Sequence, residues 1–209
     1  GAQGDGTTPL HWAVYRVDVE LIRLLLERGA KPDAINNYGS SPLAEAAKVG
    51  NAQLVEILLD AGADVESANQ EGQTALMLAA RAGSMNVAEV LVGRGADVNA
   101  REAWRGQTAL MWAADSNSPE LTRFLIDQGA NVDARALHND WPVQMTAETR
   151  NQYRPTGGMT PLLYAARVGC KDCVEAMLDA GADPNKPNPE KDKAMADALA
   201  KRKLATVAK

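Results

Sequence analysis

The residue types that most often carry chemistry are sparse in this chain, and two of them form a pair. Cys170 and Cys173 are its only cysteines, and two residues separate them. Thiolates at this spacing act as a redox pair or supply half of a metal site. The histidines available to complete a zinc site are His11 and His138. No set of nucleophile, histidine and acid and no phosphate-binding loop is recognisable, so the meaning of the cysteine pair depends on the elements that position it.

A repeat sets the positions of those elements. Its first marker is a glycine before a short Thr/Ser-, Pro/Ala- and Leu-containing segment, at Gly6, Gly39, Gly72, Gly106 and Gly158, in steps of 33, 33, 34 and 52 residues. Its second marker is a Gly–Ala pair with the same steps, at Gly29, Gly62, Gly95, Gly129 and Gly181. Two independent markers in one register indicate a repeat array, in which stacked units form one elongated domain.

Each unit predicts two helices joined by a turn. A hydroxyl residue suited to cap the first helix precedes a proline or alanine, at Thr8, Ser41, Thr74, Thr108 and Thr160. The turn after this helix is glycine in three units, Asn117 in the fourth and Val17 in the first. Asparagine tolerates a left-handed backbone whereas valine does not, so we expect a looser or differently shaped turn at Val17. Apolar residues three and four apart then predict a second helix, which the glycine of the Gly–Ala pair ends.

These residues resemble the ankyrin repeat. The resemblance rests on Thr8-Pro9-Leu10-His11-Trp12-Ala13 followed by Leu24-Leu25-Leu26-Glu27-Arg28-Gly29-Ala30, at a 33-residue period, and it covers about residues 4–186. It implies an all-α solenoid of helix-turn-helix units joined by β-hairpin loops, called fingers here. It also implies that the fingers and first helices line a concave groove, with the second helices on the convex back. The units vary, as in natural bacterial ankyrin-repeat proteins.

The register shows where the chain departs from the pattern. We expect an ankyrin domain over residues 1–187, with repeats at about 5–37, 38–70, 71–104, 105–157 and 158–187. One extra residue falls near Trp104 and Arg105, and about 19 more fall within 138–156. Both lie in the finger position, so we expect both to extend fingers on the concave side, and we expect the longer one to be ordered. Residues 188–209 predict a linker and a capping helix; a partner-binding arm is the alternative.

The register also gives the cysteines a structural explanation. Cys173 takes the core position that Leu21, Leu54, Val87 and Leu121 hold in the other units, and Cys170 lies on the preceding turn. We therefore interpret Cys173 as a buried small side chain and Cys170 as a turn residue; a local disulfide stays open. His11 lies some four repeats away and His138 lies beyond the far end of the helix pair, about 12 Å distant. We expect no metal and no cofactor. The ankyrin pattern implies that His11 bonds nearby backbone and fixes its turn.

Candidate binding residues follow from the resemblance. It implies that residues beside the finger glycine and residues closing the first helix face the groove. The candidates are Tyr15, Arg16, Tyr38, Lys48, Glu71, Arg81, Trp104, Arg105, Asp115, Trp141, Tyr153, Met159 and Arg167. Aromatic side chains beside arginine are typical of the centre of an interface. A further first-helix position, held by Trp12, Trp112 and Tyr164, is interpreted as packing between units.

A row of cations is part of this set. Four of the five first helices end near one, at Arg16, Lys48, Arg81 and Arg167. Such cations complement the helix dipole and need no partner for that. The functional alternative is a basic track that steers an acidic segment of a partner into the groove.

Composition narrows the class of partner. The 209 residues are 45% hydrophobic, enough for a sizeable core, and the net charge is −5. An acidic chain argues against nucleic acid or an anionic membrane surface as the partner, and no apolar run approaches the roughly 18 residues of a membrane span. We expect a soluble protein of the cytoplasm or, if a leader has been removed, of a bacterial periplasm.

The sequence favours binding over catalysis. We expect a non-enzymatic protein–protein interaction module whose groove holds another protein or a peptide, with the long finger supplying specificity. One alternative is a structural subunit that docks into a larger assembly through its convex back or C-terminal helix. Another is a thiol-redox role for Cys170 and Cys173. Ankyrin arrays host many unrelated roles, so the identity of the partner does not follow.

Overall fold

The computed structural model describes residues 4–137 and 158–185, and ten helices form within them. The first helices of the units are α1 (Pro9–Tyr15), α3 (Pro42–Val49), α5 (Ala75–Ala82), α7 (Ala109–Asp115) and α9 (Pro161–Val168). The second helices are α2 (Val19–Glu27), α4 (Ala52–Asp60), α6 (Met85–Gly93), α8 (Pro119–Asp127) and α10 (Lys171–Asp179). No helix in these described residues has the length and apolar character needed to cross a membrane.

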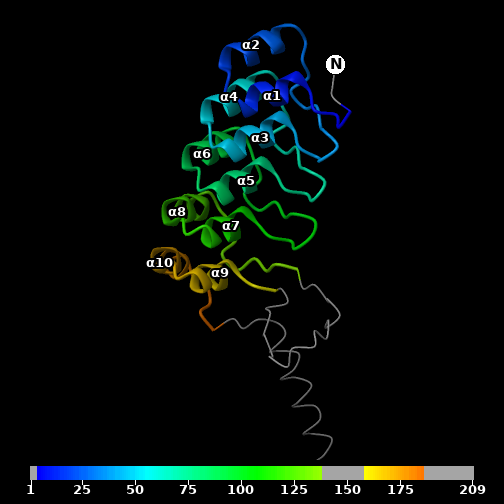
Figure 1. Cartoon of the computed structure of the whole chain (residues 1–209). Coiled ribbons are helices and arrows are strands. Elements are labelled where there is room, and N and C mark those ends of the chain that lie inside the picture. Colours follow the sequence, from blue (N-terminus) through cyan, green and yellow to red (C-terminus); the bar gives the residue numbers. More distant parts are fainter. Residues whose placement is uncertain (1–3, 138–157, 186–209) are drawn as a thin grey trace, which may run out of the picture.

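The helices stack as an all-α solenoid, as the sequence predicts. Each first helix packs on the second helix that follows it, and each also packs on the first helix of the next unit. In Figure 1 the second helices form a row on the left, the first helices lie beside them, and the fingers project to the right. Within the described part of the fingers the structure has turns and one isolated antiparallel bridge, from Ala68 to Thr74.

Local capping explains where the first helices begin. All five predicted hydroxyl residues occupy the N-cap position. The Ser41 and Thr160 side chains accept hydrogen bonds from the backbone N–H three residues on, at 3.1 and 3.4 Å. A cap of this kind stabilises a helix by about 1 kcal/mol. The prediction of these helix starts is confirmed.

The turn at Val17 differs from expectation. Its φ is 57°, in the same left-handed region as Asn117 at 55° and the glycine turns of the other units. The hydrogen bonding is also the same, because the Val17 N–H donates to Val14 O as the Gly50 N–H donates to Ala47 O. Packing of the helix pair therefore imposes one turn geometry on every unit, and a β-branched residue is held where it is strained.

The core runs the length of the stack between the two rows of helices. Fully buried alanine pairs in the middle three first helices let neighbouring helices approach closely: Ala46, Ala47, Ala79, Ala80, Ala113 and Ala114. Large buried side chains of the second helices fill the space behind them: Leu54, Leu58, Leu91, Leu121 and Leu125. The first helices are therefore held on a closely packed support, from which their outward side chains reach the groove.

Candidate functional site

Two positions of each first helix, three residues apart, share one helix face. We call these pairs the groove ladder: Trp12/Tyr15, Glu45/Lys48, Leu78/Arg81, Trp112/Asp115 and Tyr164/Arg167. Lys48, Leu78 and Arg81 line a hollow together with finger residues. These three members of the ladder therefore share one hollow with the fingers. The resemblance predicted a binding surface between first helices and fingers.

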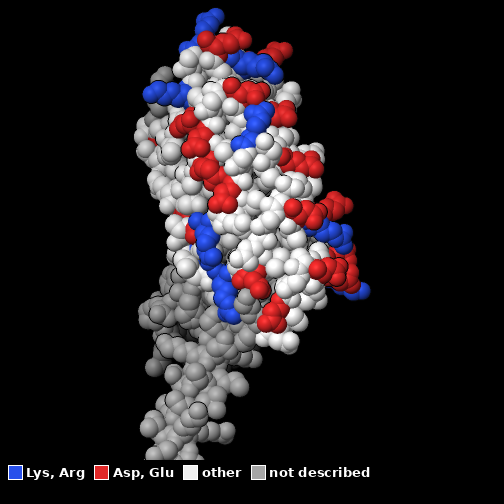
Figure 2. Space-filling view, turned by 180° about the vertical axis from the view of Figure 1, so that it is seen from behind, with Lys and Arg blue, Asp and Glu red and all other residues white. Residues whose placement is uncertain are grey.

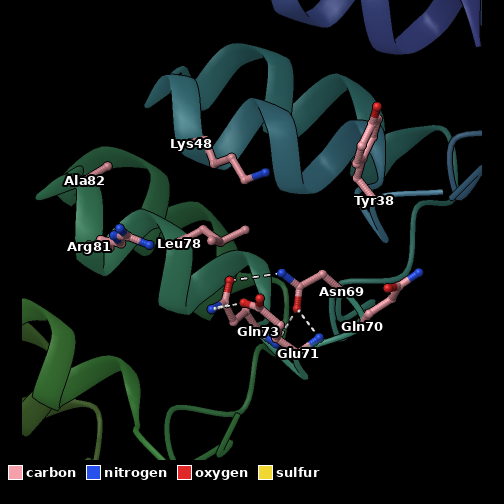
Figure 3. A pocket seen from close by; sticks show the side chains of 9 residues that line it. All are labelled: Tyr38, Lys48, Asn69, Gln70, Glu71, Gln73, Leu78, Arg81 and Ala82. Carbon is pink, nitrogen blue, oxygen red and sulfur yellow. Dashed lines mark hydrogen bonds between the residues drawn. The ribbon is translucent and has the colours of Figure 1, made fainter. Parts of the chain in front are cut away.

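The hollow has a volume of about 560 Å³ and lies between the second and third units. First-helix residues form one wall, and finger residues form the other: Tyr38, Asn69, Gln70, Glu71 and Gln73. In Figure 3 the Lys48 amine reaches into this space from α3, while Arg81 lies beside Leu78 on α5. The hollow thus combines charged, polar and apolar groups contributed by two units.

Asparagine side chains hold two of the fingers in shape. The Asn69 Oδ1 accepts from the backbone N–H groups of Glu71 and Gln73, at 3.0 and 2.9 Å. Asn36 does the same for Tyr38 and Ser40, at 3.0 and 2.9 Å. An asparagine that bonds its own turn replaces the missing strand ladder. The Tyr38 and Glu71 side chains are therefore presented from rigid turns.

Glu102 performs this task in the fourth finger, where one extra residue widens the turn. Its buried carboxylate accepts from the backbone N–H groups of Trp104, Arg105 and Gln107, at 2.7, 2.5 and 3.1 Å. The longer glutamate spans a turn that an asparagine is too short to close. Sequence analysis did not single out Glu102, although it stands seven residues after Gly95, as Asn69 stands seven after Gly62.

The fourth finger presents an aromatic–cation pair. The Trp104 side chain is exposed, and the Arg105 guanidinium lies over its ring at 5.5 Å. The finger is also tied to the fifth unit, because the Gln107 Nε2 donates to the Tyr164 hydroxyl at 2.7 Å. Burial raises the pKa of Tyr164, so the phenol stays neutral as the partner of this bond.

The four predicted cations differ in their surroundings. Lys48 forms an ion pair with Glu45 at 3.0 Å, and Arg167 forms one with Asp115 at 2.5 Å. Arg81 stacks over the Trp112 ring at 5.5 Å and has no carboxylate oxygen within 4.0 Å among the described residues. Arg16 lies one residue beyond the ladder, whose position in the first unit is Tyr15. The groove therefore carries no uniform basic track; Arg81 is the ladder cation left unneutralised in the described part.

Glu45 shows how a groove pair is balanced. Burial opposes ionisation of its carboxyl, but hydrogen bonds from Ser40 and Lys48, with the Lys48 charge, hold the pKa below its ordinary value of 4.5. The Lys48 Nζ donates to both Ser40 Oγ and Glu45 Oε1, at 3.2 and 3.0 Å. The second unit thus has a closed polar network on its ladder.

Some predicted site residues are placed differently. Met159 is only 8% exposed, so its side chain is not available on the groove surface. Trp112 and Tyr164 are buried between units as interpreted, but Trp12 is exposed because no preceding first helix covers it in the described residues. Trp141 and Tyr153 lie outside the described residues, as do most of the long finger and the C-terminal segment.

The two cysteines and His11 have structural roles. Cys170 and Cys173 are both buried, and they are joined by a disulfide whose Cα atoms lie 5.3 Å apart. The interpretation of Cys173 as a buried side chain is confirmed, and Cys170, read as a turn residue, is the buried N-cap of α10; of the states left open the structure has the disulfide. His11 is buried: its Nδ1 accepts from the Thr8 N–H and its Nε2 donates to Ser40 O, at 3.2 and 2.9 Å. It therefore fixes its own turn, as the pattern implied, and also ties the first unit to the second.

Comparison with known proteins agrees with this geometry. A family model described as ankyrin repeats, in three copies, matches residues 1–69, 46–136 and 106–188. No curated protein matches the chain. Figure 2, which views the stack from behind the side seen in Figure 1, shows acidic and basic side chains interspersed. Among the described residues, no group of three or more His, Cys, Asp or Glu is placed to hold a metal ion.

Proposed function

The chain belongs to the ankyrin repeat family, and from that premise we propose that it is a non-enzymatic module that holds another protein or a peptide in its groove. Ankyrin repeats are generally protein–protein interaction modules. In this proposal the groove ladder and the fingers form the contact surface, and residues 138–156, with Trp141 and Tyr153, add specificity at the long finger before Gly158.

The observation that carries the proposal is a set of exposed aromatic side chains on one side of the stack. Two belong to the first ladder pair and two to finger turns: Trp12 at 47% exposed, Tyr15 at 67%, Tyr38 at 73% and Trp104 at 53%. Tryptophan and tyrosine are enriched where binding energy concentrates, because they bury a large area at a small entropic cost. Exposed together, they favour an interface.

The polar groups of the groove support holding rather than converting a partner. Within the described residues they are bonded to one another, as in Ser40–Glu45–Lys48 and Asn69–Gln73–Glu71. Within the described residues the Thr8 hydroxyl lies 2.8 Å from His11 Nδ1, but this contact belongs to the helix cap, and both ring nitrogens of His11 are engaged in its own turn and the next unit. We therefore propose no catalytic role.

The test is capture of partners from the native source by the tagged chain, followed by quantitative mass spectrometry. A groove variant carries Tyr15→Ala, Tyr38→Ala and Trp104→Ala, and a matched back variant carries Glu56→Ala and Arg123→Ala on exposed faces of α4 and α8. We expect the groove variant to lose partners at least tenfold while the back variant keeps them. Circular dichroism checks that both remain folded.

Two outcomes would overturn the proposal. If a folded groove variant captured partners as well as wild type does, the groove would not be the binding surface. Loss of partners with the back variant alone would instead support the alternative that the convex side fastens the array into a larger assembly. Deletion of residues 139–155 in the same assay tests the long finger separately.

A further inference from the structure

We propose that the hollow between the second and third units receives the carboxylate of an aspartate or glutamate side chain from the partner, bound between Arg81 and Lys48. This inference rests on the proposed function, and it adds the chemistry that the groove recognises at one defined place. Figure 3 shows the two cations on the helical wall, with Glu71 and Gln73 on the finger wall.

Arg81 is the main reason for this assignment. It holds the same ladder position as Arg167, which already has Asp115 as a partner at 2.5 Å. Arg81 has no such carboxylate among the described residues, yet its guanidinium is placed by the buried Trp112 ring at 5.5 Å. A guanidinium fixed by stacking keeps its hydrogen-bond donors for a ligand and loses less entropy on binding.

Lys48 supplies a second donor to the same hollow. Its ammonium has three protons, and the described contacts use two of them, to Glu45 Oε1 and Ser40 Oγ. The Glu45 pair orients the amine on the wall of the hollow. The remaining proton is available to a carboxylate that lies against Arg81.

The charge balance selects a carboxylate over a phosphate. Lys48 and Arg81 bring two positive charges, and Glu45 and Glu71 bring two negative charges, so these four side chains sum to zero. Glu71 is turned toward Gln73, whose Nε2 donates to its Oε2 at 2.8 Å. A carboxylate adds only one negative charge beside Arg81. A phosphate adds nearly two, so it is repelled more strongly by the Glu71 carboxylate on the opposite wall.

The rim adds an apolar contact to the charged one. Tyr38 lines the hollow with most of its side chain exposed, and the largely buried Leu78 also lines it. A protein segment that places a carboxylate on Arg81 therefore has an aromatic ring for a neighbouring apolar residue. Combined apolar and charged contacts of this kind favour an acidic protein segment over a free small anion.

The experiment uses a dodecapeptide library displayed through its C-terminus, so that only side chains offer carboxylates. Peptides selected on the full chain are synthesised with each acidic residue in turn replaced by its amide. Their dissociation constants are measured by fluorescence anisotropy on wild type, Arg81→Gln and Arg81→Lys. Arg94→Gln and Arg123→Gln serve as controls outside the groove ladder, one for an arginine already paired with a carboxylate, that of Asp60 at 2.9 Å, and one for an exposed arginine of α8.

We expect one acidic peptide position whose replacement weakens binding to wild type about tenfold, as does Arg81→Gln. The two changes together should cause little further loss, because they remove the same contact. Arg81→Lys should give an intermediate loss, and both controls should stay within about twofold. Circular dichroism confirms the fold of each variant.

The failures of the two proposals are distinguishable. If selected peptides lose binding in the Tyr15/Tyr38/Trp104 variant but not in Arg81→Gln, the groove stands and the carboxylate assignment is wrong. Tighter binding of a phosphoserine peptide than of its glutamate counterpart would also overturn the carboxylate. Peptides that depend only on Glu56 and Arg123, or a library that yields no binder, would contradict groove binding itself.

Discussion

At the scale of single residues, the sequence predicted those side chains whose partners are close along the chain. The N-caps and His11 belong to this group, because their partners on the turn lie within three residues. Val17 and Glu102 show where such reasoning stops. The turn at Val17 is set by the packing of two helices and not by the backbone preference of valine. The role of Glu102 depends on the extra residue inserted two residues further along the chain.

Val17 offers a direct test of imposed backbone strain. A β-branched residue in the left-handed region destabilises the fold by about 1–2 kcal/mol. Glycine removes this strain, but the larger backbone entropy of its unfolded state offsets part of the gain. We expect Val17→Gly to raise the free energy of unfolding by about 1 kcal/mol in urea denaturation. The control is Val49→Gly, a similarly exposed valine at the last position of α3, which should lower it by about 0.5 kcal/mol, because the full glycine penalty applies to the helix interior. Destabilisation by both changes would show that position 17 is not strained.

Glu45 predicts a pH dependence whose sign is fixed by its lowered pKa. A carboxyl with a folded pKa below its unfolded value stabilises the fold above the unfolded value and loses that contribution as pH falls through the folded pKa. We expect Glu45→Gln to be less stable than wild type by under about 1 kcal/mol at pH 7, with the difference shrinking as the pH falls below the ordinary pKa of 4.5 and lost once the pH passes the lower folded pKa. Urea denaturation from pH 7 to pH 3 measures it, with exposed Glu56→Gln as control. If the stability difference between wild type and Glu45→Gln stayed constant across this pH range, the hydrogen bonds and charge of Ser40 and Lys48 would not be its cause.

At the scale of elements, helices were predictable and fingers were not. The positions of helices follow from apolar spacing and glycine stops, whereas the fingers are held by single side chains whose reach must match the turn. Glu102 is one methylene longer than Asn69 and ends in a carboxylate where Asn69 has an amide, and their turns differ by one residue. Sequence analysis located the insertion near Trp104 and Arg105 but had no measure of that reach.

The match between the length of the Glu102 side chain and the length of the fourth finger can be tested by shortening both. Glu102→Asn alone should cost about 2–3 kcal/mol, because a buried carboxylate that accepts three backbone N–H bonds is replaced by a side chain too short to serve them all. Deletion of Arg105 in the same chain restores the spacing seen at Asn69 and should recover most of the loss. Thermal denaturation of both variants decides it. If the deletion adds to the damage, the finger is held by some other contact.

At the scale of the whole molecule, the family resemblance predicted a groove side, but the sequence did not show how all of its charges pair. Glu45 and Lys48 are three residues apart on α3, so their pairing follows from local spacing. Only the packing of neighbouring units shows that Asp115 neutralises Arg167. Side chains on adjacent units lie more than thirty residues apart in sequence, so their contacts follow from the stack and not from local pattern.

The stack itself predicts that the same substitution has a different effect at its end than in its middle. Leu21 and Leu54 hold one position in α2 and α4, but Leu21 is 37% exposed and Leu54 is 0% exposed. Among the described residues, α4 packs on α6, and α6 packs on α8, whereas α2 has α1 as its main neighbour. In a linear array each unit is stabilised by its neighbours, so Leu54→Ala should cost about 3 kcal/mol and Leu21→Ala about 1 kcal/mol. Urea denaturation followed by circular dichroism measures both. Equal losses would mean that stability is spread evenly over the molecule and does not depend on a covering unit.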